Sequence, residues 1–358
     1  MYEELVKKGF SQAHLRHALE NNISAQAIAR IVSSSHEVFK ILTAESHCQA
    51  KLSGKLRFNA ESALDIPVTG DWVEIVRLPD EEALIKSVFP RSSFLARSAV
   101  GRRDQQILAA NIDTAIVVMA AGRDFNLSRT DRYLALIQDQ GILPVIFINK
   151  ADLVSEDELK SMERELYRRH PTITLFTGCA INGQGLSELV DSISAGQSFC
   201  VVGSSGVGKS SLINFIVSAE VEKVSEIGHG TGRGRHTTTT GCLHLTRQGA
   251  ILIDTPGLRE VGMTDAENGI NATFSEIEEL TSNCRFTDCT HDSEPGCAVQ
   301  EALVQGIISE EKLLSYLKLK REASRFGQTI AEKRRKDKGF GKMVRQVKKF
   351  KKENSLIR

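Results

Sequence analysis

The residues with the most evident chemistry form a glycine-rich segment that ends in a lysine and two serines. It follows an apolar run at residues 199–202 and leads into a helical pattern at residues 209–217. In such a loop, backbone N–H groups wrap around phosphates, Lys209 neutralises the β and γ phosphates, and the Ser210 hydroxyl ligates Mg²⁺. The alternative is an ordinary turn between strand and helix, but the order strand, loop and helix favours phosphate. The predicted loop matches G-x-x-x-x-G-K-S and, with one more serine, comprises Gly203, Ser204, Ser205, Gly206, Val207, Gly208, Lys209, Ser210 and Ser211.

A second motif, N-K-x-D, follows the apolar run at residues 144–148 and comprises Asn149, Lys150, Ala151 and Asp152. An Asp at this place accepts hydrogen bonds from N1 and the exocyclic amine of guanine, whereas adenine presents no matching pair of donors. Such pairing discriminates strongly, because the wrong base leaves buried groups unpaired. Alone, the four residues would fit an ordinary helix start. Beside a phosphate loop they predict a site for GTP and GDP that includes Asn149, Lys150 and Asp152.

Two further segments offer ligands for Mg²⁺ and the γ-phosphate. Asp254-Thr255-Pro256-Gly257 follows an apolar strand pattern, so Asp254 can hold the magnesium shell through water and the Gly257 N–H can reach the γ-phosphate. An ordinary strand-end turn is the alternative, disfavoured by the neighbouring motifs. The glycine-rich segment at residues 228–241 contains four consecutive threonines and suits a loop that orders when a threonine ligates Mg²⁺. We expect that ligand to be Thr238, with the adjacent threonines as alternatives.

The residue after D-x-x-G bears on hydrolysis. Many GTPases have a glutamine there that orients the attacking water, but this chain has Leu258, which cannot hydrogen-bond to water. Intrinsic hydrolysis is therefore expected to be slow unless another group or a partner positions the water. His236, in the threonine-rich loop, can orient water or accept its proton near neutral pH. The alternative is a loop histidine that only caps the loop or contacts RNA. The expected catalytic residues are thus His236, Lys209 and Thr238.

A cluster of four metal-ligand types lies nearer the C-terminus. Three thiolates and one imidazole make a closed tetrahedral set for one structural zinc ion, and Pro295-Gly296 offers a turn that returns the last cysteine. Because no coordination position is left open, catalytic zinc is not expected. Unrelated cysteines beside a surface histidine are the alternative, which the density of the cluster disfavours. The candidate ligands are Cys284, Cys289, His291 and Cys297.

The elements that must position these residues fall into several regions. Residues 1–35 have apolar residues near the helical period and predict a helical extension, and residues 36–98 have short strand patterns that predict a small β-barrel. Residues 99–273 alternate strands with helices, which indicates an α/β domain with a mainly parallel sheet. Residues 274–358 carry the cysteine cluster and a mainly helical, basic end. The expected fold is therefore multidomain.

The order of the motifs is informative. Ordinary small GTPases run from phosphate loop through switch threonine and D-x-x-G to N-K-x-D, whereas here N-K-x-D comes first, so the domain is expected to be circularly permuted. Residues 176–180 then occupy the place of the loop that backs the guanine. This order occurs together with QILAANID at residues 106–113, GRHTT at residues 234–238 and the metal motif. In these features the chain resembles the circularly permuted GTPases of the RsgA (YjeQ) type.

This resemblance implies an N-terminal OB-fold barrel, a permuted P-loop GTPase domain and a C-terminal zinc-binding domain. It also implies activity in late maturation of the small (30S) ribosomal subunit, with the subunit and its 16S rRNA as partners and with stimulation of hydrolysis by the subunit. Two other functions compete with it. The absent glutamine leaves open an RNA-binding switch that uses GTP only as a conformational ligand, and an ATP-driven remodelling enzyme is disfavoured by Asp152.

Composition bounds the remaining possibilities. Residues 333–352 contain eleven Lys or Arg and one acid, a local balance of +10 that leaves −9 for the rest of the chain, and this basic end suits RNA phosphates. No run approaches the ~18 apolar residues of a membrane helix, and residues 1–4 lack a secretory pattern. We therefore expect a cytoplasmic protein without membrane contact. With seven scattered cysteines, reduced thiols or a metal site are expected, and the default oligomeric state is a monomer.

Overall fold

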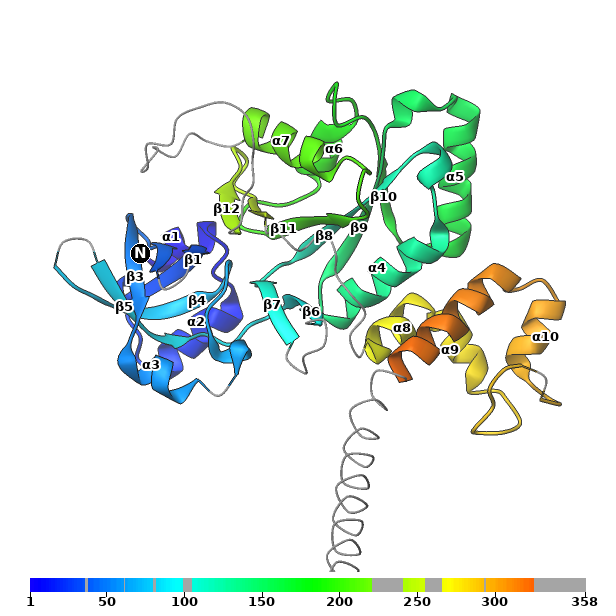
Figure 1. The fold of residues 1–358 in the computed structure, drawn as a ribbon, viewed down its shortest axis with the longest axis horizontal. Coiled ribbons are helices and arrows are strands. Elements are labelled where there is room, and N and C mark those ends of the chain that lie inside the picture. The colour runs from blue at the N-terminus through cyan, green and yellow to red at the C-terminus, as the bar shows by residue number, and fades with distance from the viewer. Residues whose placement is uncertain are drawn as a thin grey trace, which may run out of the picture.

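The computed structural model describes residues 1–35, 38–60, 62–79, 82–98, 105–220, 241–254, 266–292 and 294–324. Three parts are visible: a small barrel, a central sheet with helices on both faces, and a C-terminal helical region (Figure 1). Three expected site residues, His236, Thr238 and Gly257, lie outside the described residues, as do Leu258 and the basic segment at 333–352.

The barrel closes five strands in the order β1-β2-β3-β5-β4. Strands β3 and β5 pair in parallel, and the other pairs are antiparallel. This closed, five-stranded topology confirms the OB-fold prediction. Its core consists of alternate inward residues, among them Ile31, Ile41, Val73 and Ile85. The elements are β1 Ile28–Ser35, β2 Val38–Leu42, β3 His47–Leu52, α3 Gly54–Asn59, η2 Ala63–Asp65, β4 Trp72–Arg77 and β5 Glu82–Val88.

The N-terminal segment differs from its prediction. Helices α1 (Tyr2–Lys7) and α2 (Gln12–Glu20) and the short turn η1 (Ala25–Ala27) form, but residues 28–35 are barrel strand β1, so the helical extension to residue 35 and the barrel start at residue 36 are wrong. The spacing of Ile23, Ala27 and Ile31 fits a helix, yet burial in the barrel decides the conformation of this β-branched run. Leu5 of α1 and Phe10, between the two helices, pack in one cluster with the fully buried Trp72.

The chain leaves the barrel earlier than residue 98. Strands β6 (Phe94–Ser98) and β7 (Gln105–Ala110) pair with each other in a separate two-stranded sheet. Their inner residues, such as Leu95 and Leu108, pack into one core of the central sheet instead. The predicted boundary between barrel and GTPase domain at residues 98 and 99 therefore cuts through this hairpin.

The central sheet has the order β10-β9-β8-β11-β13-β12, and every pair is parallel except β12 with β13. The middle strands are buried on both faces, which is why they consist of continuous apolar runs. This agrees with the predicted α/β domain. The strands are β8 Thr114–Ala120, β9 Leu143–Asn149, β10 Thr174–Thr177, β11 Ser198–Gly203, β12 Cys242–Leu245 and β13 Ile251–Asp254.

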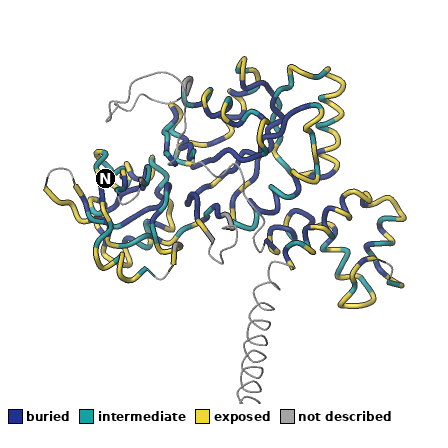
Figure 2. The backbone as a smooth tube through the Cα atoms, viewed as in Figure 1, coloured by how far each residue is buried: buried dark blue, intermediate teal, exposed yellow. Residues whose placement is uncertain are grey.

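Helices cover both faces of this sheet, and the buried sheet lies between them (Figures 1 and 2). On one face, α4 (Leu127–Asp139) and α5 (Glu156–Arg169) pack on the odd-numbered residues of β8. On the other, α6 (Leu186–Asp191) and α7 (Lys209–Glu220) pack on the even-numbered ones. Two short turns, η3 (Gly122–Asp124) and η4 (Ala151–Leu153), follow β8 and β9.

The C-terminal region is helical and begins earlier than predicted. It comprises α8 (Glu267–Thr273), α9 (Ser275–Thr281), α10 (Ala298–Val304) and a helical segment at residues 310–324. Ile270 of α8 belongs to the same buried core as Phe274 and Ile277, so the predicted boundary at residues 273 and 274 falls inside this unit. That core also includes Ala135 of α4, so it is continuous with the central domain.

A buried arginine joins the barrel to the central sheet. Arg30 of β1 donates hydrogen bonds to the carbonyls of Lys8, Gly70 and Asn111 and, at 2.7 Å, to Ser198 Oγ at the start of β11. Burial lowers the pKa of Arg30 to about 10, so the side chain stays charged at neutral pH. Among the described residues, no helix has the length and apolar composition that a membrane span requires.

Candidate nucleotide site and metal centre

The motifs singled out in the sequence meet at one edge of the central sheet. Gly203 ends β11, Asn149 ends β9, Asp254 ends β13 and Thr177 ends β10. Because these strands are parallel, their carboxyl ends lie side by side, where ligands of open α/β sheets bind. The phosphate loop lies between β11 and α7, as expected.

Two glycines of this loop are required by close approaches of their neighbours. Gly203 has φ +142°, and a Cβ there would overlap the carbonyl oxygen of Val118 on β8. Gly208 has φ +100°, and a Cβ there would overlap Asn149 Nδ2. Both conformations favour glycine, so these residues let the loop pass close to β8 and to the N-K-x-D segment.

Lys209 supplies a buried positive charge to the loop. Its side chain is 6 % exposed, and Nζ donates to the carbonyl oxygen of Gly203 at 2.7 Å and to that of Ser204. Lys209 is also the first residue of the twelve-residue helix α7, whose N-terminal N–H groups and dipole favour an anion. Ser205, Gly206 and Ser210 are exposed, so one side of the loop is open to a ligand.

The N-K-x-D segment is bonded to the phosphate loop. Asn149, only 2 % exposed, donates from Nδ2 to the carbonyl of Val207 at 2.8 Å and accepts at Oδ1 from the N–H of Ala180 at 2.9 Å. Lys150, whose backbone has φ 60°, donates from Nζ to the carbonyl of Gly206 at 2.8 Å. One buried amide therefore joins two loops that are nearly thirty residues apart in the chain.

Asp152 lies exposed in η4, beside the loop that follows β10. The Ala151 N–H donates to the carbonyl of Gly178 at 3.0 Å, and the Gly178 N–H donates to the carbonyl of Ile148 at 3.0 Å. These bonds place residues 178–180, part of the segment 176–180 expected to back the guanine, against the N-K-x-D segment. The Asp152 carboxylate is thus held beside a preformed backbone frame.

Two of the expected magnesium ligands are described. Ser210 is the second residue of α7, followed by Ser211, and Asp254 is the last residue of β13, next to β11 in the sheet. Cys242 of β12 lies directly opposite Asp254, so the chain leaving the threonine-rich segment enters the sheet beside this carboxylate. Burial lowers the pKa of the nearby His244 imidazole, and the Asp254 charge opposes that shift.

Sequence reasoning missed one cation at this site. Arg129, in the first turn of α4, donates from Nη1 to Ser204 Oγ of the phosphate loop at 3.1 Å. No local motif marks it, because its place depends on how α4 packs on the sheet.

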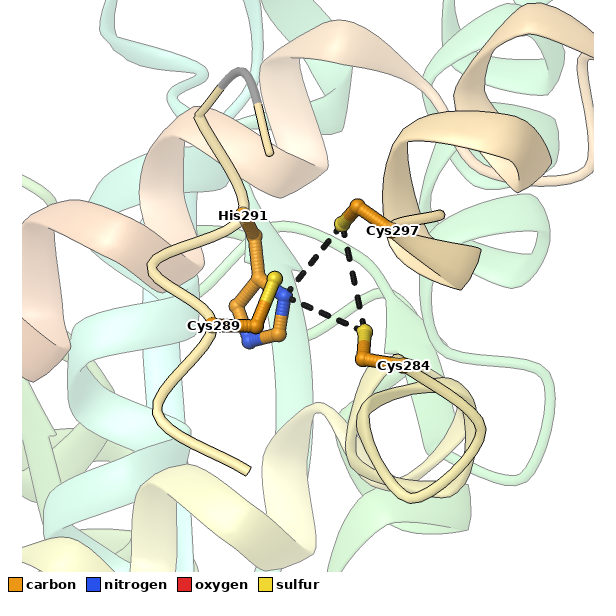
Figure 3. A group of neighbouring side chains, drawn as sticks. All are labelled: Cys284, Cys289, His291 and Cys297. Atoms are coloured by element: carbon orange, nitrogen blue, oxygen red, sulfur yellow. Dashed lines mark hydrogen bonds between the residues drawn. The ribbon is translucent and has the colours of Figure 1, made fainter. Parts of the chain in front are cut away.

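The four candidate metal ligands converge in the C-terminal region (Figure 3). Their ligand atoms all lie within 4.8 Å of one another. The Cys284 and Cys297 sulfurs are 3.9 Å apart, and His291 Nδ1 is 3.6 Å from Cys284 Sγ and 3.5 Å from Cys297 Sγ. Tetrahedral zinc with its usual bond lengths requires about 3.8 Å between two sulfurs and about 3.6 Å between sulfur and nitrogen. With Cys289, the donor set therefore fits one zinc ion with no open position.

Hydrogen bonds and turns within the loop also hold the backbone around these ligands. His291 adopts φ 60°, and its carbonyl accepts a hydrogen bond of 2.6 Å from Gln300 Nε2. Gly296, with φ +78°, makes the expected turn, and Cys297 caps the N-terminus of α10. The Glu294 carboxylate accepts from the backbone N–H groups of residues 290 and 292. The loop thus aims its side chains inward.

Comparisons with known proteins agree with this architecture. Residues 88–264 match the family model described as RsgA GTPase. The chain is 40% identical over 323 residues to the small ribosomal subunit biogenesis GTPase RsgA 2 of Lactiplantibacillus plantarum, covering 89% of each chain. It is 39% identical over 333 residues to the RsgA protein of the same description in Methanosarcina acetivorans, covering 91% of this chain and 88% of that one.

A solved structure has the same fold. The crystal structure of YjeQ from Thermotoga maritima matches with a TM-score of 0.63 and 27% sequence identity, over 83% of this chain and 98% of that one. A further neighbour at 24% identity, YloQ, is described as a circularly permuted GTPase and has a TM-score of 0.62. The permuted arrangement predicted from the motif order is therefore confirmed. On these grounds the chain belongs to the RsgA family of circularly permuted GTPases.

Proposed function

We propose that this protein hydrolyses GTP to GDP and phosphate in the biogenesis of the small ribosomal subunit. The relatives that match nearly the whole chain carry this description. The observation that carries the proposal is the Asn149 amide, which bonds to the phosphate loop at Val207 and to Ala180 in the loop proposed to back the guanine. That amide assembles phosphate and base recognition into one site.

In the proposed site, the phosphates lie on the backbone of the loop from Gly203 to Gly208, against the N-terminus of α7. When the nucleotide binds, Lys209 Nζ leaves the loop carbonyls to which it donates in this structure and bonds to the β and γ phosphates instead. Asp152 accepts hydrogen bonds from the two donors of guanine. The remaining nucleotide contacts come from Asn149, Lys150, Ser204, Ser205, Val207, Ser210, Ser211, Asp254 and Gly257.

Mg²⁺ would be held by Ser210, Asp254 and Thr238. Hydroxyl and carboxylate oxygens are the ligands that Mg²⁺ prefers. Ser210 lies in the first turn of α7, and Asp254 ends β13, the strand next to β11. The four threonines at residues 237–240 join directly to Gly241 and β12, whose first residue is opposite Asp254. When bound, the ion neutralises charge on the phosphates.

Leu258 offers no hydrogen bond to water, and we assign the orientation of the attacking water to His236. We expect His236→Ala to lower turnover stimulated by the small subunit about 10²-fold, the low end of acid–base contributions, and to leave the dissociation constant for GTP within about twofold. The measurement is phosphate release with purified subunits, together with nucleotide binding. His229→Ala, in the same glycine-rich region, is the matched control. Unchanged stimulated turnover would remove His236 from the mechanism.

The proposed partners are the small subunit and its 16S rRNA. The basic segment at residues 333–352 suits RNA phosphates, and OB-fold barrels commonly bind RNA. One structural zinc ion would stabilise the C-terminal region that precedes this basic segment. Its ligands would be Cys284, Cys289, His291 and Cys297. We further propose that the protein acts as a monomer in the cytoplasm.

The competing function is an RNA-binding switch that uses GTP only as a conformational ligand, which Leu258 keeps open. To test this, the protein is bound to small subunits with radiolabelled GTP, and the bound nucleotide is identified as GTP or GDP over time. A GTPase converts the bound GTP to GDP and then dissociates. Intact GTP in a long-lived complex would favour the switch instead.

A further inference from the structure

The first turn of helix α4 contacts two regions that the chain separates widely. Ser128 and Arg129 are adjacent residues, yet Ser128 Oγ lies 2.8 Å from Ser315 Oγ in the C-terminal helical region, and Arg129 reaches Ser204 in the phosphate loop. The separations along the chain are 187 and 75 residues. A shift of this turn would therefore change both contacts.

Of these two adjacent residues, Arg129 is the one that contacts the phosphate loop. Its guanidinium donates to the hydroxyl of Ser204, and the carbonyl of the same Ser204 accepts from the Lys209 ammonium. Two cations thus hold one residue of the phosphate loop from different elements. Asn126 caps the helix by accepting from the Arg129 N–H at 2.9 Å, which fixes the backbone from which the arginine extends.

The C-terminal region bonds to α4 at its first turn, through Ser128, and one turn along, through Arg132. Ser315 accepts a hydrogen bond of 2.9 Å from Arg169 Nη2 in addition to its contact with Ser128. Arg132, one turn along α4 from Ser128, donates from Nη2 to both carboxylate oxygens of Glu322 at 2.8 and 2.7 Å. All of these partners belong to the helical segment at residues 310–324 or to α5.

A buried carboxylate at the centre makes this contact rigid. Asp131 is fully buried and accepts hydrogen bonds from Arg169 Nε at 3.0 Å and Nη2 at 2.6 Å, and it lies 2.9 Å from His170 Nε2. Burial alone would raise the pKa of Asp131, but the bonds from His170 and Arg169 hold it below its usual value. Lys312 Nζ donates to the Arg169 carbonyl at 2.6 Å, so the network continues into the C-terminal region. Buried charges in such a network have little freedom to move separately.

We propose that Arg129 is a positioning residue for the phosphate loop and that the C-terminal region sets its place by holding the first turn of α4. A contact that displaces the C-terminal region from Ser128 and Arg132 then releases Arg129 from Ser204 and loosens the loop. This route acts in addition to the chain connection from Asp254 to Ala266. The effect on GTP turnover rests on the proposed function, whereas the effect on the loop itself does not.

The test uses the full-length protein and five variants: Arg129→Met, Arg129→Lys, Ser315→Ala, the double variant Arg129→Met/Ser315→Ala, and Arg123→Met as a matched control. Arg123 is exposed in η3, and within the described residues it makes no hydrogen bond or ion pair. Backbone amide exchange of residues 203–210 is measured without nucleotide, and affinity is measured with a fluorescent GDP analogue. Thermal unfolding and zinc content establish that each variant is folded.

We expect Arg129→Met and Ser315→Ala to speed exchange of the loop amides. We expect Arg129→Met to weaken GDP binding about three- to tenfold, the range for one ordinary hydrogen bond, because Arg129 is exposed to solvent. The double variant should match Arg129→Met alone, because Ser315 acts through Arg129. Arg129→Lys should show slower loop exchange and tighter GDP binding than Arg129→Met, because it keeps the positive charge. Arg123→Met should match the wild type.

Loop exchange in Arg129→Met within twofold of the wild type would overturn the proposal. So would a Ser315→Ala effect that simply adds to that of Arg129→Met. If the wild type fails to hydrolyse GTP, the proposed function falls while the exchange measurement still decides this inference. If exchange rises equally in peptides of the barrel, the effect is global destabilisation and the inference is wrong.

Discussion

At the scale of single residues, Asp152 is placed by its neighbours rather than by its own contacts. The Ala151–Gly178 hydrogen bond and the Asn149 amide hold the backbone just before it, and its carboxylate remains exposed. A carboxylate on an ordered backbone loses little conformational entropy when it pairs with a base. This low cost favours strong discrimination between guanine and other bases.

We expect Asp152→Asn to weaken GTP binding about 10²-fold or more, because the amide places a donor against the donors of guanine. Competition binding with GTP, GDP and xanthosine nucleotides measures this, and xanthosine nucleotides should gain relative to guanosine nucleotides. Asp157→Asn, an exposed acid at the start of α5, is the control. Equal loss of affinity for every base would mean that Asp152 does not read the base.

The zinc ligands support a second prediction at this scale. Cys289→Ser removes one of four ligands from a closed set, so purified protein should lose most of its zinc, which we expect at one ion per chain in the wild type. Metal analysis and proteolysis of residues 266–324 give the readouts. Cys48→Ser, in barrel strand β3, should keep its zinc. Full zinc in Cys289→Ser would contradict the assigned ligand set.

These residues could be predicted because each motif is contiguous or nearly so in the sequence. The phosphate loop, N-K-x-D and the Cys and His cluster each carry their own spacing, and the structure brings their described members together. Arg129, Asp131 and Arg169 could not be found this way. Their roles arise from contacts between α4, α5 and residues 310–324, which only the packing of those elements decides.

At the scale of elements, the N-terminal segment packs against the barrel in a second buried cluster that includes Trp72 and Phe89. His14 of α2 is 3 % exposed and lies 5.5 Å from the Phe10 ring and 6.2 Å from the Trp72 ring, measured between centroids. Burial, and secondarily the charge of Arg30, lowers the pKa of His14 to about 4 from 6.5. The neutral imidazole is therefore the form that fits the folded protein.

This shift predicts acid sensitivity. Between pH 6.5 and 4 the unfolded chain binds a proton at His14 that the folded chain does not, so its contribution to stability is complete above pH 6.5 and falls as the pH drops. From pH 7 to pH 5 the expected loss is about 1–2 kcal/mol. Urea unfolding followed by the fluorescence of Trp72, the only tryptophan, measures it. His14→Gln keeps an acceptor without titrating and should remove most of the loss; an identical pH dependence would refute this assignment.

The same segment shows where periodicity fails as a predictor. Residues 23, 27 and 31 repeat at the helical interval, but the chain turns at η1 and Ile28 begins a strand that pairs with both β2 and β4. Residues 28–32 of this strand are all buried, on both faces, so their burial pattern alone fits a helix as well as a strand. Long-range pairing, which the local pattern does not contain, decides between them.

At the scale of the whole molecule, two units are attached to the central domain at different places. The barrel meets the start of β11 through Arg30 and Ser198, and the C-terminal region meets α4 beside the phosphate loop. The D-x-x-G motif begins at the last residue of β13, and the next described element in the chain is α8 of that C-terminal region. Multidomain order and permutation could be predicted from motif order, whereas the contacts that make the three parts continuous could not.

The most direct test of the central claim is steady-state hydrolysis by zinc-replete protein, with GTP or ATP, in the presence and absence of purified small ribosomal subunits. The account predicts slow GTP hydrolysis by the free protein, because Leu258 replaces the usual glutamine, and strong stimulation by the subunit that is selective for GTP. Slow, unstimulated hydrolysis under conditions in which the protein binds the subunit would contradict it, as would equal turnover of ATP.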